Sequence, residues 1–204
     1  MITIIDYGLG NVLAFVNVYM RLNIPVAVAK TVADLARATR LILPGVGSFD
    51  HAMEQLDRSG MRETLERLVQ QDRMPIMGIC VGMQMLANAS DEGKLPGLGW
   101  IDGQVRKFDV TAMPRGTNLP HMGWNDVRPT VKGGLFRGLE SDARFYFLHS
   151  YYFECAQEVD VLAQTDYGPD FSCAVRRDNV YGVQFHPEKS HHSGSQLLSN
   201  FAEV

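Results

Sequence analysis

A cysteine between two glycines is the residue of this chain best suited to nucleophilic chemistry. The motif Gly78-Ile79-Cys80-Val81-Gly82 ends an apolar run, and a helix-like run over residues 83–87 follows it. Small residues on both sides let a strand turn sharply into a helix, which is the nucleophile-elbow pattern with cysteine in place of serine. We therefore expect Cys80 to be strained and exposed, at a helix N-terminus that favours its thiolate.

A thiolate nucleophile needs a base, and the base needs a group that orients it. Of the six histidines, His186 has the most suggestive surroundings, because a strand-like run leads into His186-Pro187-Glu188. Glu188 would bond one imidazole nitrogen while the other faces Cys80, with contacts of about 3 Å each. The backbone N–H groups of Val81 and Gly47 are candidates for an oxyanion hole, each worth about 3 kcal/mol in acyl transfer.

Simpler interpretations of these and other motifs stay open at this level. A cysteine in an apolar run is often an inert core thiol, and His-x-Glu is often a surface turn. Gly8-Leu9-Gly10-Asn11 follows a strand-like run but lacks the third glycine of dinucleotide-binding loops. His191 and His192 are potential metal ligands without obvious partners. Residues 120–125 form either a packed loop or an interface patch.

The elements that must position these groups alternate between strand and helix in the first half of the chain. Apolar runs predict strands over residues 2–5, 26–28, 41–43 and 75–79. Helical spacing predicts helices over residues 12–22, 32–38 and 53–70, the last interrupted at Ser59-Gly60. This order is typical of a doubly wound, mostly parallel α/β sheet flanked by helices. Ligands bind such sheets outside the carboxyl ends of the strands, where residues 8–10, residues 44–47 and Cys80 would share one rim.

The second half changes character after residue 97. Short runs predict additional antiparallel strands near residues 146–148, 161–163, 173–175 and 180–183. Asp178-Asn179 is typical of a tight hairpin turn between two of them. Residues 194–202 predict a final helix, and residues 113–117 a flexible loop.

Composition limits the class of protein. The chain has 204 residues, 46% hydrophobic and 21% charged, with a net charge of −4, which describes one ordinary globular domain over residues 1–204. Nothing in this balance indicates a nucleic acid or an anionic membrane as partner. The apolar run 2–5 is too short for a signal peptide or a membrane span, so we expect a cytoplasmic location. The other cysteines, Cys155 and Cys173, lack CxxC spacing and are expected to be structural.

Taken together, the ordered motifs resemble those of class I, triad-type glutamine amidotransferases over nearly the whole chain. The matching motifs are Pro44-Gly45-Val46-Gly47-Ser48-Phe49, Gly78-Ile79-Cys80-Val81-Gly82-Met83-Gln84, Pro120-His121-Met122-Gly123-Trp124-Asn125, His149-Ser150-Tyr151-Tyr152 and Gly182-Val183-Gln184-Phe185-His186-Pro187-Glu188-Lys189-Ser190. Within that class, the third and fourth resemble the glutaminase subunits of imidazole glycerol phosphate synthases.

The resemblance implies a glutaminase without cofactor or metal. Cys80 would attack the side-chain amide of glutamine, His186 would protonate the leaving ammonia, and Glu188 would hold His186. Val81 and Gly47 would supply the oxyanion hole. The resemblance further implies a glutamine pocket lined by Gln84, His149, Ser150 and Tyr151.

The resemblance also implies a partner, a (β/α)₈-barrel cyclase subunit that receives the ammonia in a heterodimer. In histidine biosynthesis that cyclase makes imidazole glycerol phosphate and AICAR. The residues expected to face it are His121, Met122, Trp124 and Asn125.

Three other interpretations of the chain remain to be weighed. The chain departs from the usual pattern at Val12 and at His191-His192, so it is also compatible with a divergent copy that supplies a sugar amidotransferase in surface-polysaccharide synthesis. A thiol hydrolase or peptidase on a similar scaffold would share the elbow, but has no need of the Gln-Phe-His-Pro-Glu run. A catalytically idle binding module would be expected to have lost Cys80, His186 or Glu188, and all three are present.

Overall fold

A parallel sheet forms the centre of the computed structural model, which describes residues 1–113 and 117–204. Its strands are β1 (Ile2–Ile5), β2 (Val26–Ala29), β3 (Arg40–Gly45), β4 (Ile76–Cys80) and β13 (Val180–Val183). They lie in the order β2-β1-β3-β4-β13, and each neighbouring pair is parallel. The strands β1, β3, β4 and β13 are almost wholly buried and consist mainly of apolar residues, as expected of strands covered on both faces, whereas the edge strand β2 is only partly buried.

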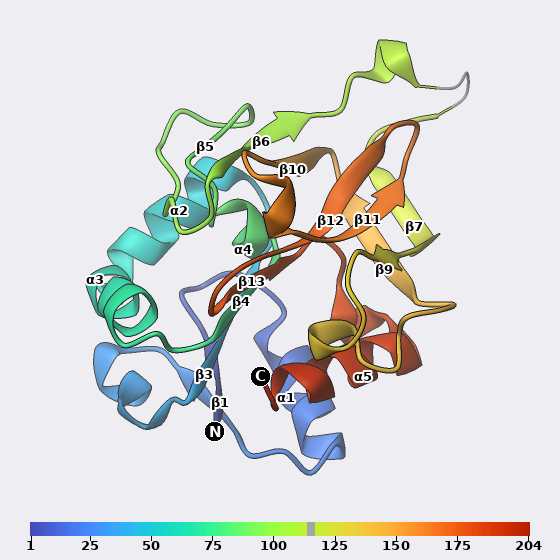
Figure 1. Ribbon diagram of the computed structural model, residues 1–204. Helices are drawn as coiled ribbons and strands as arrows, with labels where there is room; N and C mark the ends of the chain where they lie inside the picture. The colour runs from blue at the N-terminus through green and yellow to red at the C-terminus, as the bar shows by residue number, and fades with distance from the viewer. Residues whose placement is uncertain (114–116) are drawn as a thin grey trace.

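Helices cover both faces of this sheet, as Figure 1 shows. They are α1 (Val12–Arg21), α2 (Phe49–Arg58), α3 (Arg62–Glu66) with a π-helical turn (Arg67–Gln71) after it, and α5 (His191–Phe201). The helices α2 and α3 lie on one side, while α1 packs against α5 on the other (Figure 1). The predicted break at Ser59-Gly60 is confirmed, because it separates α2 from α3.

Mostly antiparallel strands extend the sheet in the second half of the chain. They are β5 (Ala89–Ser90), β6 (Gly103–Lys107), β8 (Arg128–Pro129), β10 (Tyr151–Cys155), β11 (Val161–Asp166) and β12 (Asp170–Arg177). β13 pairs antiparallel with β12, which pairs antiparallel with both β10 and β11. The predicted turn at Asp178-Asn179 joins β12 to β13, and Asp178 has a φ of 54° there. The predicted fold class, a mostly parallel α/β sheet with added antiparallel strands, is confirmed.

A small separate sheet contains residues 121–126, for which the sequence allows either a packed loop or an interface patch. It pairs β7 (His121–Asp126) antiparallel with β9 (Arg144–His149). Side chains alternate along β7, so that His121 is buried while Met122 and Trp124 are exposed. Alternation with a period of two is the pattern of a strand with one covered face. The mixture of polar and aromatic residues over 121–126 was too short to predict this strand from the sequence.

Short 3₁₀ segments connect the longer elements. The helix predicted over residues 32–38 is a 3₁₀ helix (Val32–Arg37), in which Ala38 N–H donates to the Leu35 carbonyl three residues back. The Asp34 carboxylate accepts the N–H of Thr31 at 2.9 Å and caps its start. The other 3₁₀ segments are Val110–Ala112, Gly134–Phe136, Glu158–Asp160 and Pro187–Lys189. Most of the loop predicted over residues 113–117 lies outside the described residues.

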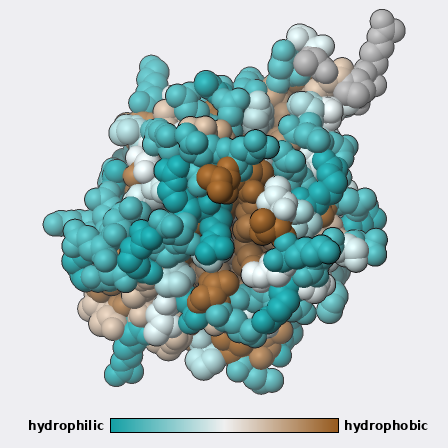
Figure 2. Space-filling model, in the orientation of Figure 1, coloured by the Kyte–Doolittle hydropathy of each residue, from teal (hydrophilic) through white to brown (hydrophobic). Residues whose placement is uncertain are grey.

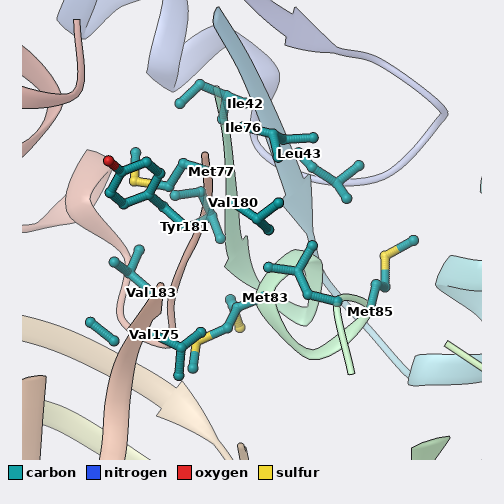
Figure 3. Packing of buried hydrophobic residues seen from close by; sticks show 14 of the residues in the cluster. Ile42, Leu43, Ile76, Met77, Met83, Met85, Val175, Val180, Tyr181 and Val183 are labelled. Atoms are coloured by element: carbon teal, nitrogen blue, oxygen red, sulfur yellow. The ribbon is translucent and has the colours of Figure 1, made fainter. Parts of the chain in front are cut away.

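The core anchors the segment that carries Cys80. Figure 3 shows side chains of β3, β4, β12 and β13 packed around the turn that follows β4. Those labelled are Ile42, Leu43, Ile76, Met77, Met83, Met85, Val175, Val180, Tyr181 and Val183, all at most 5% exposed. Burying a side chain of this size contributes about 1.5–3 kcal/mol, so the position of the elbow is strongly fixed.

The surface seen in Figure 2 is mostly hydrophilic, with separate hydrophobic patches near its middle. The charged side chains therefore lie mainly outside this core. Each helix in the described part of the chain is too short or too polar to cross a membrane.

Candidate active site

Cys80 lies where β4 turns into a one-turn helix, α4 (Val81–Gln84). Its backbone has φ 55° and ψ −113°, a conformation that residues with a side chain rarely adopt. Such conformations cost about 1–3 kcal/mol and cluster at functional sites. The predicted strain at Cys80 is confirmed.

This turn requires glycine at positions 78 and 82, because a side chain at either position would collide with the backbone. A Cβ on Gly78 would lie 2.4 Å from the Gly82 carbonyl oxygen, and a Cβ on Gly82 would lie 2.0 Å from the Leu43 carbonyl oxygen. Both contacts are backbone contacts in a close-packed region, so the neighbours cannot move away without disturbing β3. This agrees with the requirement for small residues on both sides of the cysteine.

The thiol of Cys80 is covered by neighbouring groups. The residue is only 5% exposed, so the prediction of an exposed cysteine is wrong. Its Sγ lies 3.7 Å from the Nε2 of Gln184, and it donates to the Leu148 carbonyl oxygen at 3.9 Å. The residues after β13 and at the end of β9 therefore close over the elbow.

The helix after Cys80 is shorter than the sequence indicated. It begins at Val81 and ends at Gln84, whereas the helix-like run continued to residue 87. The N–H groups of Leu86 and Ala87 donate to the carbonyls of Met83 and Gln84, three residues back, so the α-helical pattern of bonds four residues back ends there. Because α4 has a single turn, its dipole contributes less to the site than that of a full helix.

His186 and Glu188 form a bonded pair at the end of the strand that runs beside Cys80. The Nδ1 of His186 lies 2.9 Å from Oε1 of Glu188, and the imidazole hydrogen-bonds to the Cys80 thiol. The backbone N–H of His186 donates to the Tyr146 carbonyl at 2.8 Å, and Ser190 Oγ donates to the His186 carbonyl at 2.6 Å. These contacts bring the three predicted catalytic residues together in the order Cys80, His186, Glu188.

The charge state of His186 follows from these neighbours. Burial alone would lower its pKa, but hydrogen bonds to Cys80 and Glu188, together with the charges of both groups, raise the pKa to about 10. The ring therefore carries its proton at neutral pH and can donate it. Glu188 is covered as well, and its Oε2 is buried without a hydrogen-bond partner among the described residues.

The turn over residues 44–47 lies directly beside the elbow. Gly45 is paired with Cys80 in the parallel register of β3 and β4. Gly47 has a φ of 86°, which favours glycine over any residue with a side chain. The phenolic oxygen of Tyr7 donates to the Pro44 carbonyl at 2.8 Å, so the loop after β1 meets the same rim. The expected meeting of these strand ends with the thiol is confirmed.

A pocket of about 310 Å³ opens beside Cys80. All the residues predicted to form the triad, the oxyanion hole and the substrate pocket line it, except Glu188, which lies behind His186: Gly47, Cys80, Val81, Gln84, His149, Ser150, Tyr151 and His186. It is also lined by residues without a predicted role: Val46, Glu92, Pro120, Leu148 and Lys189. This volume suits a small polar molecule such as an amino acid.

Two groups near the thiol were missed by sequence reasoning. Gln184 is fully buried and donates from Nε2 to Cys80 Sγ. Its signal was its place two residues before His186 in an extended run, which puts both side chains on the same face. Glu92 brings a carboxylate to the pocket, and its Oε2 accepts the N–H of Phe49 at 2.9 Å. No motif around Glu92 marked it.

The four residues expected to face a partner do not share one environment. His121 is 3% exposed and bonds inward to His149, which corrects the prediction that its side chain faces a partner. Met122 is 61% exposed and Trp124 is 41% exposed, with Trp124 stacked on His191. Asn125 is half-buried and donates to the Asp166 carbonyl at 2.6 Å. Only Met122 and Trp124 present apolar side chains to the outside.

The buried imidazole of His121 predicts a loss of stability at acid pH. Burial lowers its pKa to about 4, with a smaller opposing effect from Asp166. The folded pKa lies below the ordinary value of about 6.5, so protonation favours the unfolded chain. This contribution to stability is present above pH 6.5 and is lost as the pH falls toward 4.

We therefore expect wild type to lose about 2 kcal/mol more unfolding free energy between pH 7 and pH 5 than the variant His121→Phe. Urea unfolding of both proteins at each pH measures this. Equal losses in the two proteins would contradict a neutral buried His121.

Comparison with known proteins shows which family this chain belongs to. The family model described as glutamine amidotransferase class-I matches residues 3–204. The chain belongs to the class I glutamine amidotransferases. Among individual proteins, the chain is 64% identical to "Imidazole glycerol phosphate synthase subunit HisH" of Bdellovibrio bacteriovorus over all of both chains. It is 50% identical to the protein of the same name from Leptospira interrogans, again over all of both chains.

Solved structures agree on the fold of this amidotransferase. The structure described as "Crystal structure of glutamine amidotransferase" matches with a TM-score of 0.75 and 21% identity, over 100% of this chain and 99% of the other. At that identity the match supports the architecture alone. The predicted resemblance to class I glutamine amidotransferases is confirmed, and the chain is an enzyme subunit of that class.

Proposed function

We propose that this amidotransferase is the glutaminase subunit of an imidazole glycerol phosphate synthase and supplies ammonia for histidine biosynthesis. The observation that carries the proposal is the bonded arrangement of Cys80, His186 and Glu188 beside a pocket of amino-acid size. The full-length identity of 64% to a protein named as a subunit of that synthase supports the pathway. In this proposal residues 1–204 act as one glutamine amidotransferase domain, in the cytoplasm.

The proposed reaction begins with attack of the Cys80 sulfur on the side-chain amide carbon of glutamine. A carbon–sulfur bond forms, the carbon–nitrogen bond breaks, and His186 gives its proton to the leaving ammonia. The resulting glutamyl thioester is hydrolysed by a water molecule whose proton returns to His186, which releases glutamate and the thiolate. Glu188 keeps Nδ1 of His186 bonded throughout, so that the other ring nitrogen faces the sulfur.

The negative charge that develops on the amide oxygen needs donors nearby. We assign this role to the backbone N–H groups of Val81, which follows Cys80, and of Gly47 in the neighbouring turn. Each donor of this kind is worth about 3 kcal/mol in acyl transfer. The assignment is supported by the register that puts Gly45 beside Cys80.

Glutamine would be held by the residues that line the pocket. Gln84, His149, Ser150 and Tyr151 keep their proposed role in substrate binding, supported by their place in the lining. We add Glu92, because its carboxylate is suited to the ammonium group of a free amino acid. No metal or cofactor takes part in these steps.

The proposed partner is a (β/α)₈-barrel cyclase subunit that uses the ammonia to make imidazole glycerol phosphate and AICAR. Its docking surface would include the exposed Met122 and Trp124, with Asn125 beside them on β7. A mixture of this chain with the cyclase of the same organism tests the proposal. We expect a heterodimer that converts glutamine to glutamate faster than this chain alone. Binding to a sugar amidotransferase instead would contradict the proposed pathway while leaving the glutaminase chemistry intact.

Replacing Trp124 by alanine is expected to weaken the complex with the cyclase by about 10- to 100-fold, because exposed tryptophans are frequent hot spots. The Cys80 thiol should still react with an alkylating glutamine analogue. Titration of the cyclase, followed by glutamate release, measures the first effect. The matched control is Val159→Ala, which removes an exposed apolar side chain in a different part of the chain. Loss of alkylation in Trp124→Ala would place Trp124 in the pocket and not at the interface.

A further inference from the structure

Two buried histidines lie opposite each other between the outer strand β7 and the pocket. His121 and His149 are partners in the antiparallel register of β7 and β9. Nδ1 of His121 lies 3.0 Å from Nε2 of His149, and the residues are 3% and 6% exposed. The mechanism above gives His121 no role and gives His149 only a proposed role in substrate binding, from its place in the pocket wall.

The carbonyl at one end of this pair fixes the direction of its hydrogen bonds. The Tyr151 carbonyl can only accept, so Nδ1 of His149, 2.8 Å away, must donate. In a neutral ring Nε2 of His149 is then the acceptor, and Nδ1 of His121 donates to it. This leaves Nε2 of His121 to accept from the Asn125 amide, whose Nδ2 is 3.4 Å away. Burial favours neutral rings, because it lowers the pKa of His149 to about 3.

The same carbonyl connects the pair to the nucleophile. Nε2 of Gln84 donates to the Tyr151 carbonyl at 3.2 Å and to Oε1 of Gln184 at 3.0 Å. Nε2 of Gln184 in turn lies 3.7 Å from Cys80 Sγ. Gln84 and Gln184 are at most 2% exposed, so neither amide can turn without losing buried hydrogen bonds.

Aromatic rings fix the orientation of His121. Its ring stacks on Tyr167, with centroids 4.0 Å apart and planes at 20°, and on Phe147, at 4.7 Å and 18°. The ring therefore cannot leave its plane, and its two nitrogens point along the chain of hydrogen bonds. At the outer end, Asn125 also donates to the Asp166 carbonyl at 2.6 Å.

We propose that His121 and His149 are positioning residues: a continuous chain from Asn125 through both imidazoles, the Tyr151 carbonyl, Gln84 and Gln184 holds the sulfur of Cys80 in place. The inference rests on the proposed glutaminase function. It also links strand β7, which carries Met122 and Trp124 on its outer face, to the nucleophile. A shift of β7 would change the His121–His149 distance and thereby the positions of the side-chain amides of Gln84 and Gln184.

The first test compares variants of His121 in the complex with the cyclase. His121→Phe keeps a ring in the stack but removes both hydrogen bonds. We expect kcat for glutamine to fall about tenfold per active site with KM within about twofold, because the substrate pocket is kept while the sulfur is less well held. His121→Gln, which can both donate and accept, should recover most of kcat. The matched control is His51→Phe, because His51 is an exposed histidine that takes no part in this chain of hydrogen bonds.

Active sites are counted by reaction with an alkylating glutamine analogue, so that unfolded protein does not lower the apparent kcat. An unchanged kcat per titrated site in His121→Phe would overturn the proposal, as would an equal fall in His51→Phe. Failure of the wild-type complex to release glutamate would instead refute the proposed function. This outcome is distinguishable, because it does not depend on any comparison with the His121 variants.

The second test needs no variant. Nitrogen NMR of the wild-type imidazoles at neutral pH should find both rings neutral, with the proton on Nδ1 of His121 and of His149. A proton on Nε2 of either ring, or a doubly protonated ring, would break the chain of hydrogen bonds and overturn the proposal.

Discussion

Cys80→Ala is expected to reduce glutamate release from glutamine by about 10⁴-fold or more, even with the cyclase present. The variant keeps the pocket but removes the sulfur that forms the proposed thioester, and removal of a triad nucleophile costs most of the rate that the triad supplies. Because the variant removes one sulfur atom, whose hydrogen-bond contacts are Gln184 and Leu148, and leaves the backbone of the elbow unchanged, it should fold and bind its partner.

The measurement is glutamate release by the purified complex, with circular dichroism and partner binding as checks on folding. Cys155→Ala is the matched control, since Cys155 is also a free thiol and is half-buried. Burial raises the pKa of Cys155 to about 12, so it is not a thiolate at neutral pH and its loss should leave turnover unchanged. Turnover retained in Cys80→Ala would refute the assignment of the nucleophile.

Glu188→Gln is expected to lower kcat by about 10⁴-fold, in line with the loss seen when the orienting carboxylate of a triad becomes an amide. The carboxylate accepts from Nδ1 of His186 at 2.9 Å and helps to raise the pKa of that ring. An amide can present a donor to Nδ1 instead, which favours the wrong tautomer, and it no longer stabilises the imidazolium. We therefore expect the pKa of His186 to fall in the variant.

A pH profile of kcat separates this effect from simple misfolding. In wild type the proton donor should be available well into the alkaline range, whereas in Glu188→Gln the residual activity should be lost at lower pH. Glu158→Gln, a change of an exposed carboxylate at the start of a 3₁₀ segment, is the control. Activity within tenfold of wild type would mean that Glu188 does not orient His186.

The central parallel sheet was predictable because its inner strands β1, β3, β4 and β13 are buried on both faces. Residues 2–5, 41–43 and 75–79 are largely apolar runs that are followed by Asp6, Pro44 and Cys80, so strand and strand end are both visible in the sequence. The elbow was equally visible, because the close contacts of Gly78 and Gly82 exclude any side chain.

The strands of the second half were harder to predict, since their pairing joins distant segments. β7 has one covered face, and its alternation becomes evident only beside β9. The sequence predicts that His121 faces a partner, because nothing in the run over residues 120–125 reveals that His149, on the other strand, hydrogen-bonds to it and that its side chain is buried.

In the candidate site, too, local features were predictable from the sequence and contacts between distant segments were not. The pairing of His186 with Glu188 follows from a separation of two residues, and the sequence predicted it. The role of Gln184 depends on three partners from other elements, Gln84, Tyr151 and Cys80, and no local pattern encodes such a network. The prediction that Cys80 is exposed was wrong for the same reason, because the groups that cover its sulfur come from β9 and from the segment that follows β13.

The most direct test is to map where an alkylating glutamine analogue attaches to the wild-type protein. Mass spectrometry of the digested protein should find the label on Cys80 and not on Cys155 or Cys173, and excess glutamine should prevent labelling. This result would identify Cys80 as the thiol that meets the side chain of glutamine. Labelling of Cys155 or Cys173 instead, or loss of turnover without label on Cys80, would contradict the mechanism.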